Sequence, residues 1–142
     1  MKATNTTKSI KEKNIVRGWH KIDVKGRVLG RVVPQIAKLL QGKQKKDYAP
    51  YLDCGDNVVI VNASKVELSG RKSNVKKYTR YSGYPGGLKV ETFAELLTKN
   101  PAKIIEHAVS GMLPKNKFRS DRLRRLFVFK DEHHKFSDKF TK

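Results

Sequence analysis

Six cationic side chains stand close together in the segment "PKNKFRSDRLRR", which runs from Pro114 to Arg125 and holds one acid, Asp121. These cations are Lys115, Lys117, Arg119, Arg122, Arg124 and Arg125. Ammonium and guanidinium groups bind phosphate because they displace the counterions condensed on a nucleic acid, and arginine can hold one phosphate with two parallel hydrogen bonds. The spacing therefore indicates phosphate-binding chemistry.

Two further basic clusters occur at Lys43–Lys46 and at Arg71–Arg80, in predicted loops or at the ends of predicted elements. Tyr78, Tyr81 and Tyr84 are interleaved with the cations of the second cluster. A tyrosine ring can stack on an unpaired base, as in RNA-binding proteins, or it can pack against a sheet. The sequence leaves both roles open.

Catalytic and cofactor-binding patterns are weak by comparison. "GRVLGR" (Gly26–Arg31) places glycines ahead of a predicted helix, where backbone N–H groups can bind phosphate. It lacks the third glycine of the dinucleotide fingerprint, and no Walker lysine follows. We interpret it as a tight turn with an RNA phosphate contact through Arg27 and Arg31.

The acids and the single thiol also give little sign of catalysis. Asp23, Asp53 and Asp56 could be combined into the magnesium site of a nuclease, but aspartate beside a turn more often bonds to the backbone. Cys54 has no convincing histidine partner, and the four histidines show no zinc-ligand spacing. We expect no enzymatic activity, no metal and no cofactor.

The overall charge points to a polyanionic partner. The chain has 142 residues, with 32 Lys and Arg against 13 Asp and Glu, a formal net charge of +19. Such an excess creates a strong positive field. The longest clear apolar run, Val58–Val61, is far too short to span a membrane, and the cations are not gathered on one amphipathic helix. We therefore expect nucleic acid as the partner, with no membrane and no small-molecule substrate.

The apolar pattern of the first half predicts elements that can position these groups. Trp19–Val24 alternates as a strand, and apolar residues at helical spacing predict a helix from Leu29 to Leu40, capped by Gly42. Pro34 interrupts this pattern, so the regular helix should begin near Val33 or have a distorted first turn. Gly42–Asp56 is predicted to be a loop.

The second half continues the alternation of strands and helices. Asn57–Ala63 reads as a strand covered on both faces, and Lys65–Gly70 as a possible short strand. Arg71–Gly87 is expected to be extended and to close in a glycine turn. Thr92–Glu95 and Asn100-Pro101 are helix starts, and a last strand follows at Leu126–Phe129.

The second of these helices should bury one face, made by Ile104, Ile105, Ala108, Val109 and Met112. The whole alternation predicts an α/β domain with a largely parallel sheet. We divide the chain into a flexible basic arm at 1–18, an RNA-binding domain at 19–130 and a polar tail at 131–142.

Four stretches are more specific than the composition. "WHKIDVKGRVLGR", "LLQGKQKKDYAPYLDCGDNVVIVNASKVELSGRK", "YSGYPGGLK" and "HAVSGMLPKN" occur in this order. Together they resemble the large-subunit ribosomal protein L13 family in its bacterial form. The resemblance implies a three-layer α/β/α domain with a mainly parallel sheet of about four strands. It also implies a non-enzymatic protein that binds large-subunit rRNA, adjoins other large-subunit proteins and joins the particle early in assembly.

The resemblance and the basic clusters together define the candidate RNA-binding residues. Those carried by matching motifs are Lys43, Lys45, Lys46, Arg71, Lys72, Tyr84, Gly86, Gly87, Lys115 and Asn116. Those added by the basic clusters and the glycine turn are Arg27, Arg31, Lys76, Lys77, Arg80, Lys117, Arg119, Arg122 and Arg124.

The apolar flanks of Lys115–Arg125 suggest that a rigid sheet fixes the spacing of its phosphate contacts. Such contacts position a protein but do not read sequence, so recognition should depend on RNA shape. Replacing Arg122, Arg124 and Arg125 by Gln should then weaken RNA binding and leave the fold intact.

Two alternatives stay open at this point: an RNA-binding regulator acting away from the ribosome, and a nuclease. A ribosome of the bacterial cytoplasm fits best, and an organellar ribosome is a further possibility.

Overall fold

A sheet of three parallel strands lies at the centre of the computed structural model, which describes residues 11–140. The strands β1 (Trp19–Asp23), β2 (Asn57–Val61) and β5 (Leu126–Val128) are arranged in the order β1-β2-β5. Val58–Val61 of the middle strand are at most 1% exposed, as their unbroken apolar run predicts. The predicted single-domain α/β fold with a mainly parallel sheet is confirmed.

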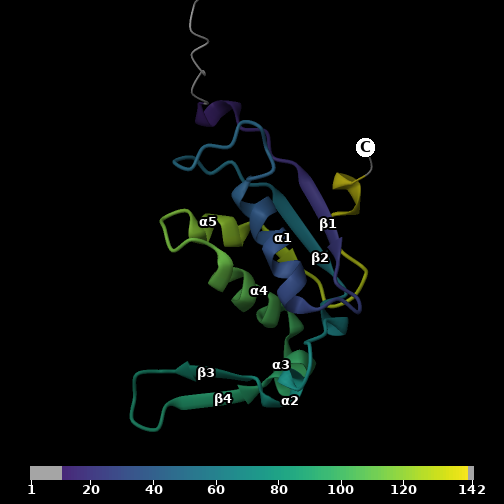
Figure 1. Ribbon diagram of the computed structural model, residues 1–142, viewed down its shortest axis with the longest axis vertical. Helices are drawn as coiled ribbons and strands as arrows, with labels where there is room; N and C mark the ends of the chain where they lie inside the picture. The colour runs from purple at the N-terminus through teal and green to yellow at the C-terminus, as the bar shows by residue number, and fades with distance from the viewer. Residues whose placement is uncertain (1–10, 141–142) are drawn as a thin grey trace, which may run out of the picture.

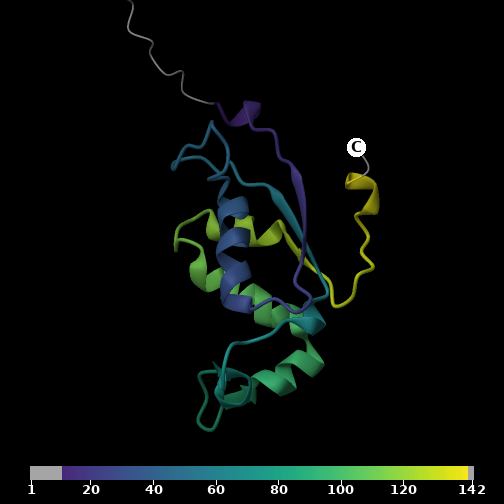
Figure 2. The same cartoon turned by 45° about the vertical axis from the view of Figure 1, so that its right-hand side comes forward.

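Two helices, α1 (Leu29–Gln41) and α4 (Pro101–Met112), cover one face of this sheet (Figures 1 and 2). The predicted start of the regular helix near Val33 is wrong, because α1 begins at Leu29 and contains Pro34. Leu29 is buried, and its N–H donates to the Glu67 carbonyl at 2.9 Å. These contacts fix the first turn ahead of the exposed proline.

The end of α1 depends on two glycines. Gly42 caps the helix at φ 78°, a left-handed conformation that favours glycine, and its N–H donates to the Lys38 and Leu39 carbonyls. Gly55 lies so close to the Leu40 carbonyl that any Cβ there would collide with it. The loop at 42–56 is therefore held against the end of α1, as far as the start of β2.

The opposite face of the sheet is covered by the C-terminal segment, which contains the 3₁₀ turn η3 (Ser137–Lys139) (Figure 2). Trp19 of β1 stacks on Phe127 of β5 at 5.8 Å between ring centroids. Phe136 lies 4.6 Å from Phe127 and 5.0 Å from Trp19, again between centroids. Aromatic side chains of residues 131–140 thus form the third layer, on the face where the family resemblance implied helices.

A second, antiparallel sheet consists of the hairpin β3 (Lys77–Tyr81) and β4 (Leu88–Thr92), preceded by the short helix α2 (Lys72–Val75). The parallel sheet has three strands among the described residues, fewer than the four expected. The possible strand at Lys65–Gly70 forms only an isolated bridge between Glu67 and Val28, after the 3₁₀ turn η2 (Ala63–Lys65). Asn62 redirects the chain there, at φ 61°.

The helix starts were predicted correctly. Thr92 caps α3 (Phe93–Lys99) in a capping box with Glu95, and Pro101 opens α4 after Asn100. Met112, however, is 49% exposed, so its predicted place on the buried face of α4 is wrong. The remaining helices are η1 (Glu12–Asn14) and α5 (Arg119–Arg124). Residues 1–10 of the predicted arm lie outside the described part of the chain.

Candidate nucleic-acid interface

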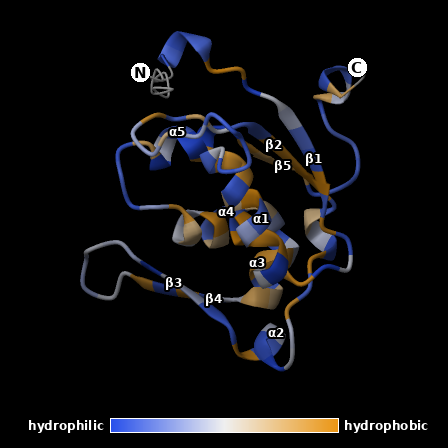
Figure 3. Ribbon diagram, turned by 45° about the horizontal axis from the view of Figure 1, so that its top comes forward, coloured by the Kyte–Doolittle hydropathy of each residue, from blue (hydrophilic) through white to orange (hydrophobic). Residues whose placement is uncertain are grey.

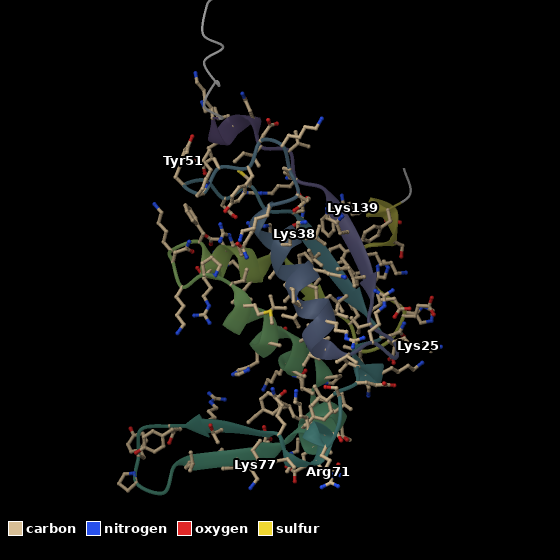
Figure 4. The ribbon with its side chains drawn as sticks, in the orientation of Figure 1. Lys25, Lys38, Tyr51, Arg71, Lys77 and Lys139 are labelled. Atoms are coloured by element: carbon tan, nitrogen blue, oxygen red, sulfur yellow. The ribbon has the colours of Figure 1, made fainter. Side chains whose placement is uncertain are left out.

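The basic clusters follow one another along the long axis of the molecule. In Figure 1 the loop after α1 lies at the upper end, α5 lies below it, and α2 with the hairpin lies at the lower end. Arg71 and Lys77 are labelled at this lower end in Figure 4. Figure 3 shows hydrophobic residues in the central sheet and hydrophilic residues over α2 and the segment between α4 and α5.

Most of the sequence-predicted cations are exposed. We call them the exposed basic set: Arg27, Arg31, Lys43, Lys46, Arg71, Lys72, Lys76, Lys77, Arg80, Lys115, Lys117 and Arg124. Asn116, between Lys115 and Lys117, is also exposed. These side chains can approach a polyanion without a change of fold.

Arg122 and Arg125 have a different role, because both bind Asp53. Arg122 is 2% exposed, and its Nε lies 3.4 Å from Asp53 Oδ1. Arg125 binds both carboxylate oxygens of Asp53, at 2.6 and 2.7 Å. Burial by itself raises the pKa of Asp53, but its hydrogen bonds and ion pairs with Arg125 and then Arg122 outweigh this and lower the pKa below its ordinary value.

This geometry removes Arg122 from the candidate RNA-binding residues. It also contradicts the expectation that replacing Arg122, Arg124 and Arg125 by Gln leaves the fold intact, because two of the three hold a half-buried carboxylate. Arg119 is also engaged, since its Nη2 donates to Ser110 Oγ of α4 at 2.6 Å.

A second carboxylate, Asp56, is 3% exposed and joins β1 to the loop after α1. It accepts hydrogen bonds from the Gly18 N–H at 2.9 Å and from Gln44 Nε2 at 2.7 Å, and it contacts His20 Nε2 at 2.9 Å. Burial raises the pKa of Asp56, but hydrogen bonds from Lys45, His20 and the Gly18 N–H together lower it below its ordinary value.

Lys45 is therefore a structural residue in this fold. Its Nζ forms an ion pair with Asp56 and donates to the carbonyls of Val16 at 2.6 Å and Cys54 at 2.9 Å. Lys43 and Lys46 beside it are exposed. This half-buried lysine anchors the loop, and its two exposed neighbours remain available to phosphate.

The imagined magnesium site is not assembled. Asp56 precedes β2, whereas Asp23 ends β1, and the parallel register places these two ends of the sheet apart. Asp23 accepts hydrogen bonds from the Lys25 N–H and from Asn62 Nδ2, both at 2.9 Å, and the two bonds lower its pKa. Residues 11–140 contain no group of three or more His, Cys, Asp or Glu placed to hold a metal.

The three tyrosines of the hairpin separate into two roles. Tyr78 is half-buried beside the core, and its ring meets His107 edge-on at 5.6 Å between centroids. Tyr81 and Tyr84 are 64% and 76% exposed. Packing accounts for Tyr78, whereas Tyr81 and Tyr84 have rings free to stack on a base.

Gly86 and Gly87 shape the tip of the hairpin. Gly86 has φ 73°, and a Cβ on Gly87 would collide with Ser82 Oγ. The Gly87 N–H donates to the Tyr84 carbonyl at 2.9 Å. These glycines hold Tyr84 at an exposed turn.

The described residues include no helix that is both long enough and apolar enough to cross a membrane.

Comparison with known proteins decides the family: residues 17–135 match the family model described as ribosomal protein L13. The chain belongs to the ribosomal protein L13 family.

Relatives named large ribosomal subunit protein uL13 resemble the chain over most of its length. The protein from Nitratiruptor is 48% identical over 128 residues, which are 90% of this chain and 91% of the relative. The protein from Wolinella succinogenes is 46% identical over 138 residues, 97% of this chain and 99% of the relative. The protein from Micrococcus luteus is 51% identical over 118 residues, 83% of this chain and 80% of the relative.

Among the exposed cations of this L13 family member that the sequence analysis did not select, Lys89 of β4 and Lys103 of α4 lie beside a selected residue, Arg80. Neither belongs to a basic cluster, so charge density along the chain gives no sign of them. Lys89 pairs with Arg80 across the hairpin, and Lys103 lines the same cleft as both. The alternation of side chains along β4 and the position of Lys103 on the polar face of α4 are the sequence patterns that could have predicted their exposure.

Proposed function

We propose that the chain is a structural constituent of the large ribosomal subunit and binds large-subunit rRNA through the exposed basic set. Membership of the ribosomal protein L13 family supports the place in the subunit. The separation of exposed cations from cations bound to Asp53 and Asp56 supports the mode of binding. The fold neutralises only part of its charge internally and leaves the remainder for phosphate.

Recognition in this proposal depends on phosphate positions and RNA shape. The exposed basic set is distributed over rigid element ends and loops, so it can contact several phosphates at fixed separations. Tyr84 adds an exposed ring at the hairpin tip, where an unpaired base can stack.

The protein acts in this proposal without catalysis, metal or cofactor. It joins the particle early and supports assembly by fixing the RNA strands that it contacts. Neighbouring large-subunit proteins are its expected protein partners. The exposed apolar side chains of the hairpin, Tyr81, Leu88 and Val90, are the candidates for that contact. The proposed location is the ribosome of a bacterial cytoplasm, and an organellar ribosome fits the same residues.

Sedimentation of a gently opened lysate tests the proposal. We expect the chain to travel with the large subunit and to remain there after a high-salt wash that removes loosely held basic proteins, because many phosphate contacts must break together. Recovery of the chain at the top of the gradient, bound to a messenger or to no RNA, would overturn the proposal in favour of a free regulator.

A further inference from the structure

A cleft lies between α4 and the hairpin, and the hairpin is at the lower end of the molecule in Figure 1. It has a volume of about 480 Å³, and its lining includes Tyr78, Arg80, Lys89, Glu91, Lys103 and His107. The antiparallel register places Arg80 opposite Lys89 and Tyr78 opposite Glu91, so these four side chains share one face of the hairpin. That face looks toward α4.

A second cleft, of about 660 Å³, lies between α4 and α5. Its lining includes Lys103, Glu106, His107, Ser110, Leu123 and Arg124. Lys103 and His107 line both clefts, so the two meet over the exposed face of α4. We call this continuous surface, from Arg80 of β3 to Arg124 of α5, the α4 groove.

The walls of the α4 groove are cationic and its floor is partly apolar. Arg80, Lys89, Lys103 and Arg124 are all exposed. Of the two acids, Glu91 is bound to Lys99 at 3.1 Å, and Glu106 lies on α4. The floor includes the rings of Tyr78 and His107 and the side chains of Leu96 and Leu123.

The groove is also held in shape. Arg119 of α5 donates to Ser110 of α4 at 2.6 Å, and this bond fixes one wall relative to the floor. The other wall is fixed by Tyr78, which packs on His107 of α4. A site that exists before binding loses less conformational entropy when it takes up a ligand.

We propose that the α4 groove binds one strand of large-subunit rRNA, whose backbone crosses α4 between the hairpin and α5. Phosphates bind Arg80, Lys89, Lys103 and Arg124, and sugars or unstacked bases lie on the floor. This inference rests on the proposed function and adds to it a strand path and two binding residues, Lys89 and Lys103.

The two faces of the hairpin favour RNA over protein as the occupant of the groove. The outer face carries Tyr81, Leu88 and Val90, which are 64%, 59% and 47% exposed, and Lys77 where the hairpin joins α2. The inner face carries Arg80 and Lys89. On the inner face Arg80 and Lys89 stand side by side and complement a polyanion, whereas the part of the outer face beyond Lys77 has the apolar character that a protein neighbour would cover.

The test measures binding of the full chain to large-subunit rRNA as a function of salt. The variant Lys89→Gln/Lys103→Gln should reduce the slope of log K against log salt by about 1.5 and weaken binding about tenfold at roughly 0.1 M salt, because each phosphate contact contributes about 0.7–0.9 to the slope. The matched control is Lys25→Gln/Lys130→Gln, which changes two exposed lysines away from the groove; Lys25 is labelled far from the hairpin in Figure 4.

The outcomes separate this inference from the proposed function. If the unaltered chain binds the rRNA and the groove variant matches the control, the α4 groove is not an RNA site, while the proposed function stands. If the unaltered chain does not bind, the proposed function itself is wrong.

Acylation of lysines in intact large subunits gives a second test. Lys103 should be protected and Lys25 modified, and digestion of the RNA should expose Lys103. Protection of Lys103 that survives complete digestion would assign the groove to a protein neighbour and overturn the inference.

Discussion

Individual arginines of the segment from Lys115 to Arg125 do two different jobs. Arg124 has a side chain that is 81% exposed, and its single ion pair is a surface contact with Asp121 at 3.4 Å. Arg122 and Arg125 instead share Asp53, and Arg122 also lies over the Phe118 ring at 5.6 Å. The crowding of cations before β5 therefore combines groups that hold the fold with groups that can face phosphate.

Substitution of Arg122 and of Arg124 should distinguish the structural role from the surface role. Arg122→Gln should lower the free energy of unfolding by about 2 kcal/mol, because it removes a charged hydrogen-bond donor to Asp53 and the contact with the Phe118 ring, while Arg125 still pairs with Asp53. Arg124→Gln is the matched control and should change it by less than about 0.5 kcal/mol, since its pair is exposed. Urea denaturation of the two variants measures the difference, and equal unfolding free energies would disprove a structural role for Arg122.

The sequence predicted the cations of this segment, but it did not predict which of them bind a carboxylate and which remain exposed. Charge density identified the cluster, and the choice between phosphate and carboxylate for each arginine depends on Asp53, which lies 69 residues before Arg122 in the chain. No local pattern carries that information. Lys45 was assigned to RNA for the same reason, since its carboxylate partner is fixed only when β1 and the loop after α1 meet.

At the scale of elements, the sequence predicted β1, α1, β2, the capping box of α3 and the start of α4. These elements have local causes: alternation, helical spacing, caps and a glycine stop. The C-terminal layer and the α4 groove were not predicted. Phe127 and Phe136 meet across the sheet face without any regular spacing, and the groove joins β3, β4, α4 and α5 through tertiary packing alone.

The carboxylates that hold the loop after α1, Asp53 and Asp56, should make the stability of the fold sensitive to acid. In the folded chain the pKa values of Asp53 and Asp56 lie below the ordinary aspartate value of about 3.9. At a pH between the folded pKa values and about 3.9, the unfolded chain therefore binds more protons than the folded chain. Their contribution to stability should be complete above about pH 5 and should be lost as the pH falls through the folded pKa values. Urea denaturation at a series of pH values should therefore show stability falling below about pH 5.

Two measurements check this assignment. Asp56→Asn should flatten the loss of stability with acid, whereas Asp121→Asn, at an exposed acid, should leave it unchanged. If Asp56→Asn does not fold, titration of the carboxyl carbons by NMR in the unaltered chain decides the matter. A folded pKa of Asp56 at or above about 3.9 would refute the assignment.

At the scale of the whole molecule, the net charge of +19 is distributed by the fold. The cations that bind Asp53 and Asp56 include Arg122 of α5, Arg125 directly after it and Lys45 of the loop after α1. The loops, the first turn of α1, α2, the hairpin and α5 carry the exposed basic set along the long axis (Figure 1). Such a surface repels itself in the free protein, and a polyanionic partner relieves that repulsion. The arrangement suits a protein whose working state is bound to RNA.

The salt dependence of rRNA binding tests the central claim most directly, namely that exposed cations hold RNA while the cations bound to Asp53 and Asp56 hold the fold. Lys115→Gln/Lys117→Gln/Arg124→Gln should fold like the unaltered chain and reduce the slope of log K against log salt by about 2, at about 0.7–0.9 for each lost phosphate contact. The control variant Lys25→Gln/Lys130→Gln should retain more of the salt slope than this triple variant does. A triple variant with the slope and affinity of the unaltered chain would contradict the account.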